Sequence, residues 1–254
     1  MERLNAFWKM KRDGSRVAGV NSRPIPLIIA PSGTGKSFLV RHFARVNNLP
    51  ILALDSSAWI VSGANTTPHT VNLIHQFTRN HETGVLMIDE LDKFYADSIS
   101  DWSRSVLGEV MSLLDGGLRG FEVFSDEEKR KLQNSFFMVG CATFQSLYKA
   151  GGKNMGFQQG SANFSIEHEV VKSAGIPHEL LARFNCNLLV MTPPKVEEFA
   201  DWIEAIHDAL QIESSVSVEK LSEEAFSSGL CTRWLEAYVS KLLLAEKQPL
   251  DIEF

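Results

Sequence analysis

Residues 30 to 37 read A-P-S-G-T-G-K-S, and these residue types could form a loop that binds phosphate groups. The general pattern of such a loop is G-x-x-x-x-G-K-[ST], so Ala30 stands where the first glycine belongs. Gly33 and Gly35 can adopt positive φ, which lets successive backbone N–H groups point into one concavity. We expect Ala30 to be tolerated if its dihedrals are ordinary, because the first glycine only helps the strand turn into the loop.

The end of this loop carries two side chains that suit a nucleotide with its metal ion. Lys36 would reach the terminal phosphates, and the Ser37 hydroxyl would coordinate Mg²⁺. Ser32, Thr34 and Phe38 are further candidates for contact with the nucleotide. An apolar strand before the loop and a helical pattern after it favour this interpretation over a chance Gly-Lys-Ser. The expected ligands are therefore ATP and Mg²⁺.

Two carboxylates follow a second apolar strand, in the segment G-V-L-M-I-D-E-L-D-K-F at 84–94. Ligands of open parallel sheets bind at the carboxyl ends of the strands, which is where Asp89 and Glu90 stand. Asp89 is the candidate Mg²⁺ partner, directly or through water, and Glu90 is the candidate general base for the attacking water. The alternative is a helix N-cap followed by a first-turn acid. The phosphate loop upstream favours the catalytic interpretation, because each half of such a site needs the other.

The hydrophobic pattern predicts an α/β fold with a parallel sheet covered by helices on both faces. Five apolar segments are expected to form strands: 25–29, 51–54, 85–88, 136–141 and 187–191. Helical patterns lie between them, and the segment before the fourth strand reads as a charged loop. After Pro194 the pattern becomes purely helical, at 195–210, 217–227 and 230–246. We therefore expect an N-terminal arm at 1–24, an α/β domain at 25–194 and a small helical domain at 195–254.

The composition is that of an ordinary globular protein. The 254 residues are 44% hydrophobic and 22% charged, with a net charge of −6. The acidic balance argues against a broad nucleic-acid surface, although residues 1–24 are locally basic and could form a solvated arm or an intersubunit edge. Three cysteines far apart predict reduced thiols in a cytoplasmic protein. No segment approaches the roughly 18 apolar residues of a membrane span.

Together these motifs resemble an AAA+ ATPase module, and the resemblance covers nearly the whole chain. It implies a P-loop NTPase sheet followed by a helical lid, with the sensor strand at 136–143 lying between the strands of the phosphate loop and of Asp89. Thr143 would be sensor 1 and would help to place the attacking water. Arg233, in S-G-L-C-T-R-W-L, would be the sensor 2 arginine of the lid and contact nucleotide in the same chain.

The segment I-P-H-E-L-L-A-R-F-N at 176–185 is similar to the family segment that ends in an arginine finger. Arg183 would be this finger and would offer a fork of donors to the charge developing on the γ-phosphate. In this family the finger reaches into the neighbouring subunit, so a ring or spiral, most commonly a hexamer when ATP is bound, is implied. The alternative is a surface arginine near a strand.

Within the family the motifs are most similar to the ClpX and HslU unfoldases, including V-M-S-L-L-D-G at 110–116. Two features depart from them. Ala64 takes the place of the pore-loop aromatic residue, unless a shifted loop uses 59–61, whose alternative is buried packing. We also expect no zinc-binding domain before the phosphate loop. The tripeptide at 155–157, Met-Gly-Phe, falls where ClpX contacts its protease, and a plain surface loop is the alternative.

The leading hypothesis is an ATP hydrolase that assembles through Arg183 and remodels a macromolecular partner in the manner of a chaperone. A protein partner is favoured over nucleic acid by the acidic balance. The alternatives are a nucleotide-controlled, DNA-associated scaffold or loader, which the basic arm would suit, and a slow ATP-binding assembly switch. Small-molecule kinases share the phosphate loop, but Glu90, the finger segment and the helical lid disfavour them.

Overall fold

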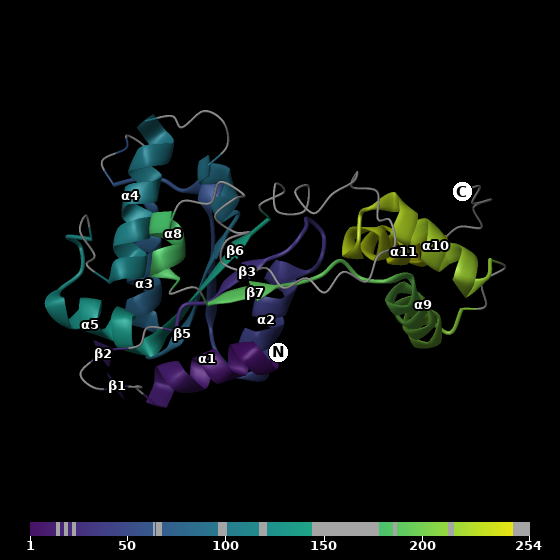
Figure 1. Cartoon of the computed structure of the whole chain (residues 1–254), viewed down its shortest axis with the longest axis horizontal. Helices are drawn as coiled ribbons and strands as arrows, with labels where there is room; N and C mark the ends of the chain where they lie inside the picture. Colours follow the sequence, from purple (N-terminus) through teal and green to yellow (C-terminus); the bar gives the residue numbers. More distant parts are fainter. Residues whose placement is uncertain are drawn as a thin grey trace. The chain divides into compact units, whose positions relative to one another are not determined.

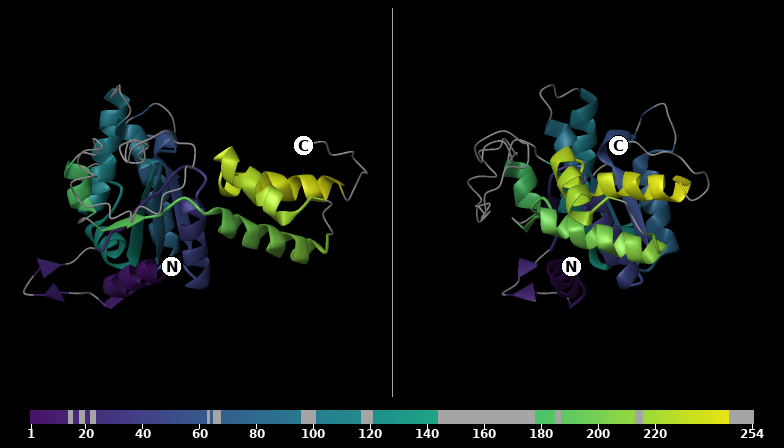
Figure 2. Two further views of the ribbon diagram at one scale, coloured as in Figure 1. Left: turned by 45° about the vertical axis from the view of Figure 1, so that its right-hand side comes forward. Right: turned by 90° about the vertical axis from the view of Figure 1, so that its right-hand side faces the viewer.

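The computed structural model of the chain describes two compact units (Figures 1 and 2). The described residues are 1–13, 16–17, 20–21, 24–62, 64, 68–95, 101–116, 121–143, 178–184, 187–212 and 216–245. Within them, residues 1–30, 36–143 and 178–190 form the sheet unit. Pro31–Gly35 and residues 191–245 form the lid unit. The glycine-rich loop thus groups with the C-terminal helices, although it lies early in the sequence.

Five parallel strands form the centre of the sheet unit. They are β3 (Leu27–Ile29), β4 (Ile51–Asp55), β5 (Gly84–Asp89), β6 (Phe136–Ala142) and β7 (Leu188–Val190). Their order across the sheet is β4-β5-β6-β3-β7, so β6 lies between the strand of the phosphate loop and that of Asp89. The fold class and this strand order confirm the sequence prediction. A short antiparallel pair, β1 (Arg16–Val17) and β2 (Val20–Asn21), precedes the sheet.

Helices cover both faces of this sheet (Figure 1). They are α1 (Glu2–Asp13), α2 (Lys36–Val46), α3 (Thr70–Asn80), α4 (Asp101–Asp115), α5 (Asp126–Ser135) and α8 (His178–Arg183), with short 3-10 turns η1 (Ser56–Ala58) and η2 (Leu91–Tyr95). The charged-loop prediction before β6 was wrong, because α5 occupies that segment. A capping box begins α5, with Ser125 and Glu128 each accepting the other's backbone N–H. The sequence did not predict this helix because it lacks an apolar face: Leu132 is its one buried residue.

Alternating residues of β6 hold the helices on opposite faces of the sheet, as the period of a strand requires. Phe137 packs against Phe43 of α2 and Trp8 of α1, at ring-centroid distances of 5.6 Å and 5.8 Å. Its neighbour Phe136 meets Phe77 of α3 edge to face at 5.6 Å on the other side. Aromatic pairs in this geometry stabilise a core beyond their area burial. The fully buried β6 thus anchors three helices that are far apart in sequence.

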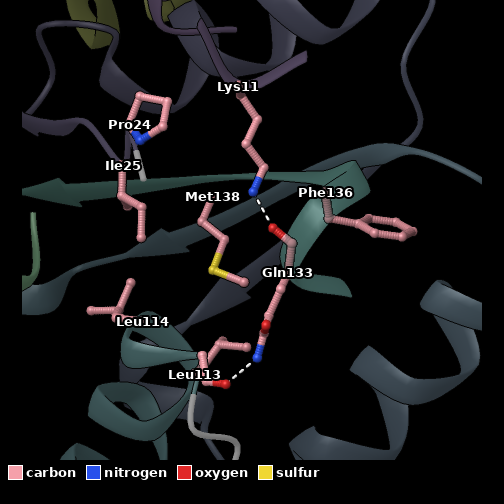
Figure 3. A pocket seen from close by; sticks show the side chains of 9 residues that line it. Lys11, Pro24, Ile25, Leu113, Leu114, Gln133, Phe136 and Met138 are labelled. Atoms are coloured by element: carbon pink, nitrogen blue, oxygen red, sulfur yellow. Dashed lines mark hydrogen bonds between the residues drawn. The ribbon is translucent and has the colours of Figure 1, made fainter. Parts of the chain in front are cut away.

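The first helix of the N-terminal arm is part of the sheet unit rather than a solvated arm. Leu4 of α1 is buried, and Asn47 at the end of α2 donates to Asn5 at 3.3 Å. Lys11 donates to the backbone carbonyl of Gln133 at the end of α5, where a cation is favoured by the helix dipole (Figure 3). The cavity beside Lys11 measures about 20 Å³, room for about one water molecule, so it is no ligand site.

Three helices form the core of the lid unit: α9 (Val196–Leu210), α10 (Val218–Ser228) and α11 (Thr232–Ala245). Their bounds lie within two residues of the helices that the apolar pattern predicts. Phe199 and Ile203 of α9 meet Leu221 of α10 and Trp234 and Tyr238 of α11 in one apolar cluster. α10 ends at Gly229, which has a φ of 68° and so takes the left-handed conformation common at helix ends.

Across the part of the chain that the structure describes, no helix combines the length and apolar character needed to cross a membrane. Cys141 and Cys231 are buried thiols, one in each unit, and form no disulfide with each other. Burial raises the pKa of the Cys141 thiol, so this cysteine is a packing residue rather than a nucleophile.

A glycine in β6 lets α8 approach the sheet closely. A Cβ at Gly140 would lie 2.6 Å from the ring of Phe184 and 2.8 Å from Leu91. We predict that Gly140→Ala lowers the free energy of unfolding by about 1–3 kcal/mol through overpacking. The matched variant Gly108→Ala, inside α4 with no atom within 4 Å of the new Cβ, should raise it by about 0.5–1 kcal/mol. Urea unfolding of both proteins measures the difference, and equal midpoints would contradict the close approach.

Candidate nucleotide site

The carboxyl ends of three neighbouring strands bring the predicted site residues of the sheet unit together. Ile29 at the end of β3 pairs with Ala142 of β6, and Ile88 of β5 pairs with Gly140. Since parallel strands in register end at the same edge, the residues that follow them converge there. Lys36, Asp89 and Thr143 are linked at this edge through the hydrogen bonds described below.

Lys36 is buried at the start of α2, and its ammonium reaches back over the strand end. It donates to the carbonyl of Ala30 at 2.9 Å and to the hydroxyl of Thr143 at 3.2 Å. Ala30 is fully buried and is not among the residues with positive φ. The prediction that an alanine methyl is tolerated at this position is therefore confirmed.

Ser37 and Asp89 form a pair of adjacent oxygen ligands. The Ser37 hydroxyl donates to one carboxylate oxygen of Asp89, and the backbone N–H of Glu90 donates to the other at 2.9 Å. Ser56 fixes the strand end by donating to the carbonyl of Asp89 at 2.6 Å. A hydroxyl beside a carboxylate suits Mg²⁺, which prefers oxygen and usually takes only one or two protein ligands besides phosphate and water. The residues present thus fit this ion.

Glu90 has a φ of 59°, in the left-handed region that residues other than glycine seldom occupy. Such strain is concentrated at functional sites. Its carboxylate pairs with Lys93 at 2.5 Å, and this hydrogen bond raises the pKa of the Lys93 ammonium. Burial would raise the pKa of Asp55, but hydrogen bonds from Ser57, followed by one with Glu90, lower it below its ordinary value. Glu90 therefore lies between a cation and a second carboxylate.

Thr143 is positioned by a residue that sequence reasoning did not select. Its backbone N–H donates to the carboxylate of Asp92 at 2.8 Å, which ties the end of β6 to η2. Asp92, Lys93 and Asp55 were all missed as site residues. The D-E-L-D-K sequence contained a signal for two of them, because a 3-10 turn directly after Glu90 returns Asp92 and Lys93 toward the sheet edge.

The glycine-rich loop, Pro31–Gly35, has the backbone conformation that convergent N–H groups require. Gly33 and Gly35 have φ values of 79° and 86°, as predicted from their freedom of rotation. The Thr34 hydroxyl donates to the carbonyl of Pro31 at 2.8 Å and closes the turn of the loop. The loop leads directly into the N-terminus of α2, where anionic groups are favoured.

Two further predicted contact residues are open to solvent. Ser32 is exposed in the loop, and Phe38 is 71% exposed on α2, where its ring stacks on His42 at a centroid distance of 6.0 Å. An exposed aromatic ring directly after Ser37 offers a flat apolar surface to a nucleotide base. Contact of Ser32 and Phe38 with the nucleotide stays a prediction.

Arg183, the predicted arginine finger, is held within its own chain. Its guanidinium pairs with Asp115 at the end of α4 at 2.8 Å and donates to the carbonyl of Glu179 at 2.9 Å. The side chain is 25% exposed, while its Nε is buried and makes no hydrogen bond. Arg233, the predicted sensor 2 residue, is exposed in the first turn of α11. Both roles stay predictions.

The hypothesis of a shifted pore loop at Trp59 is wrong. Trp59 is 2% exposed, and its indole N–H donates to Glu109 of α4 at 2.8 Å. Glu109 also accepts the backbone N–H of Ser62 at 2.7 Å, so it holds this segment against α4. The alternative of buried packing is confirmed. The tripeptide at 155–157 lies outside the described residues.

Comparisons with known proteins agree with this geometry. Residues 26–150 match the family model "ATPase family associated with various cellular activities (AAA)". A stretch of 93 residues is 25% identical to the "ATPase family gene 2 protein" of Schizosaccharomyces pombe. That alignment covers 35% of this chain and 12% of the relative, so the match concerns a small part of the relative's length.

Residues 26–150 are therefore similar to an AAA ATPase domain, and the sheet has the strand order of a P-loop NTPase fold. Domains of this class bind nucleotide, and the reaction of this domain is the hydrolysis of ATP. The predictions of an AAA+ ATPase and of ATP hydrolysis are confirmed. The finer likeness to the ClpX and HslU unfoldases stays a prediction.

The contact between Thr143 and Lys36 can be tested by removing the hydroxyl. We predict that Thr143→Val lowers kcat about tenfold, since the ammonium loses one hydrogen bond near the reacting phosphate. Thr78→Val is the control, because it removes the hydroxyl of a buried threonine that donates to the backbone carbonyl of Ile74 at 2.8 Å within α3. Steady-state hydrolysis by both variants provides the measurement. Equal rates in the two would contradict a role for Thr143 in the site.

Proposed function

We propose that this chain hydrolyses ATP within an oligomer and uses the reaction to remodel a macromolecular partner, most readily a protein. The observation that carries the proposal is the convergence of Lys36, Ser37, Asp89, Glu90 and Thr143 at one edge of the sheet. This set supplies a phosphate contact, metal ligands, a base and a polar group near the water. Arg183 pairs with Asp115 of its own chain and is not part of this cluster, so in this proposal the arginine comes from a neighbouring subunit.

Each residue of the cluster has a distinct role in this proposal. Lys36 contacts the terminal phosphates, and its bond to Thr143 keeps the ammonium at the end of β6. Mg²⁺, held by Ser37 and Asp89, would neutralise part of the phosphate charge. Glu90 orients the attacking water and accepts its proton. To do so, its carboxylate releases Lys93 and binds the water instead.

Arg183 links hydrolysis to assembly in this proposal. Its bidentate fork matches the oxygens of a γ-phosphate as well as those of a carboxylate. The carboxylate of Asp115 therefore binds the guanidinium of Arg183 until the γ-phosphate of a neighbouring nucleotide replaces that carboxylate. Loss of the γ-phosphate removes that contact and returns Arg183 to Asp115, which changes the geometry of the interface.

The distribution of charge bears on the class of partner. The helices α9, α10 and α11 hold nine acidic residues against three basic ones. This surface would repel nucleic acid and favours a protein partner. The helices α1 and α2 show the opposite balance, with seven basic residues against two acidic ones. Nucleic acid, bound by a scaffold or loader, is accordingly the alternative partner.

The role of Glu90 provides the test of the proposed function. We predict that Glu90→Gln binds ATP, lowers kcat by about 100-fold or more, and accumulates as an ATP-bound oligomer on a sizing column. Glu82→Gln is the control, because this exposed carboxylate pairs only on the surface with Lys131. If Glu90→Gln hydrolyses ATP at the rate of the control, Glu90 is not the general base. An ATP-bound protein that stays monomeric would refute assembly.

The same variant identifies the class of partner. A complex that the ATP-bound Glu90→Gln protein captures and that survives nuclease treatment contains a protein partner. Loss of the captured material on nuclease treatment would instead support the scaffold or loader.

A further inference from the structure

The lid unit contains a direct connection between the glycine-rich loop and the start of α11. The carbonyl of Gly33 accepts two hydrogen bonds from Thr232, one from the backbone N–H at 2.9 Å and one from the hydroxyl at 2.6 Å. The two residues are 199 positions apart in the sequence. Both belong to the same compact unit. A doubly hydrogen-bonded carbonyl has a fixed direction, so Thr232 sets the orientation of this peptide group.

The chain around Thr232 is shaped to make this contact. A Cβ at Gly33 would lie 2.5 Å from the carbonyl oxygen of Leu230, so only glycine allows the approach. Cys231 is buried with a φ of 51°, and Gly229 has a φ of 68°. A non-glycine residue in the left-handed region is strained, and such strain persists where the surroundings require it. The segment 229–232 thus carries strain where it meets the loop.

The orientation of the Gly33 carbonyl has a consequence for phosphate binding. In a trans peptide the carbonyl and the next N–H point in opposite directions. With the carbonyl of Gly33 turned toward Thr232, the N–H of Thr34 points to the opposite side, where it lies 3.5 Å from the carbonyl of Pro31. A contact of that length is weak, so a phosphate oxygen can replace it readily.

We propose that Thr232 is a positioning residue that presents the Thr34 N–H to the phosphates of a bound nucleoside diphosphate or triphosphate. It acts through the Gly33 peptide and makes no contact with the nucleotide itself. The inference deepens the ATPase function and rests on nucleotide occupying this loop. It also gives the lid a second link to the nucleotide, separate from the direct contact predicted for Arg233. A tilt of α11 would rotate the peptide group between Gly33 and Thr34, whose N–H faces the phosphates.

The proposal is tested by changing the hydroxyl alone. Thr232→Val keeps the side-chain shape and the backbone N–H bond but removes the hydroxyl bond. Thr232→Ser restores the hydroxyl. Ser222→Ala serves as the control for lid stability, because Ser222 is buried in the same unit and donates to the carbonyl of Glu219 at 2.8 Å. Calorimetry with ADP and steady-state kinetics with ATP are run on the wild type and the three variants, each as the whole 254-residue chain.

We expect Thr232→Val to weaken ADP binding and raise KM for ATP by about tenfold, the loss of one hydrogen bond, while kcat changes by less than about threefold. Thr232→Ser and Ser222→Ala should bind ADP as wild type does. Hydrogen exchange supplies a readout apart from activity: ADP should slow exchange in residues 230–235 of the wild type, and less so in Thr232→Val.

Wild-type ADP affinity in Thr232→Val, or equal weakening in Ser222→Ala, would overturn the inference. A wild-type protein that fails to bind ADP would overturn it together with the nucleotide site. A protein that binds ADP but never assembles with ATP would refute the oligomeric function and leave the role of Thr232 intact, because the contact between Thr232 and Gly33 lies within one chain.

Discussion

The buried ammonium of Lys36 is the interaction on which the rest of the sheet unit depends. A charge removed from water costs free energy unless dipoles or opposite charges compensate for it. Here a carbonyl at the end of β3 and a hydroxyl at the end of β6 accept hydrogen bonds from the ammonium, so the two strand ends must be held in register. The same hydrogen bonds place the ammonium where the terminal phosphates of a nucleotide are expected. The hydrogen bonds of the Lys36 ammonium therefore account both for the register of the two strand ends and for the position of the cation in the site.

The strands and the centre of the site could be predicted from the sequence because both are encoded locally. Apolar runs such as Val85–Ile88 specify buried strands, and the topology of a parallel sheet then brings Lys36, Asp89 and Thr143 to one edge. The nearby Asp92 was not predictable in this way. Its place depends on how the chain turns after Glu90, and that turn combines a strained φ with a short 3-10 segment.

Long-range contacts set the limit of sequence reasoning in both units. The basic composition of the arm suggested a solvated segment, but Leu4 is buried and Trp8 packs on Phe137 of β6, more than a hundred residues later in the chain. Likewise no local pattern connects Gly33 with Thr232. Trp59 illustrates the reverse error, since an apolar segment near an expected functional loop was used for packing against Glu109. For the arm and for Trp59, the outcome was decided by which surface was available to bury the side chain.

The central claim is that Arg183 acts on the nucleotide of a neighbouring subunit, and mixing two inactive variants tests it most directly. Arg183→Ala retains its own Glu90, whereas Glu90→Gln retains its Arg183, so a mixed assembly contains interfaces with both groups intact. The account predicts that each protein alone is inactive and that an equal mixture recovers up to about a quarter of the wild-type rate, the share of complete interfaces in a head-to-tail ring. A mixture that stays as inactive as its components, while the two proteins demonstrably co-assemble, would contradict it.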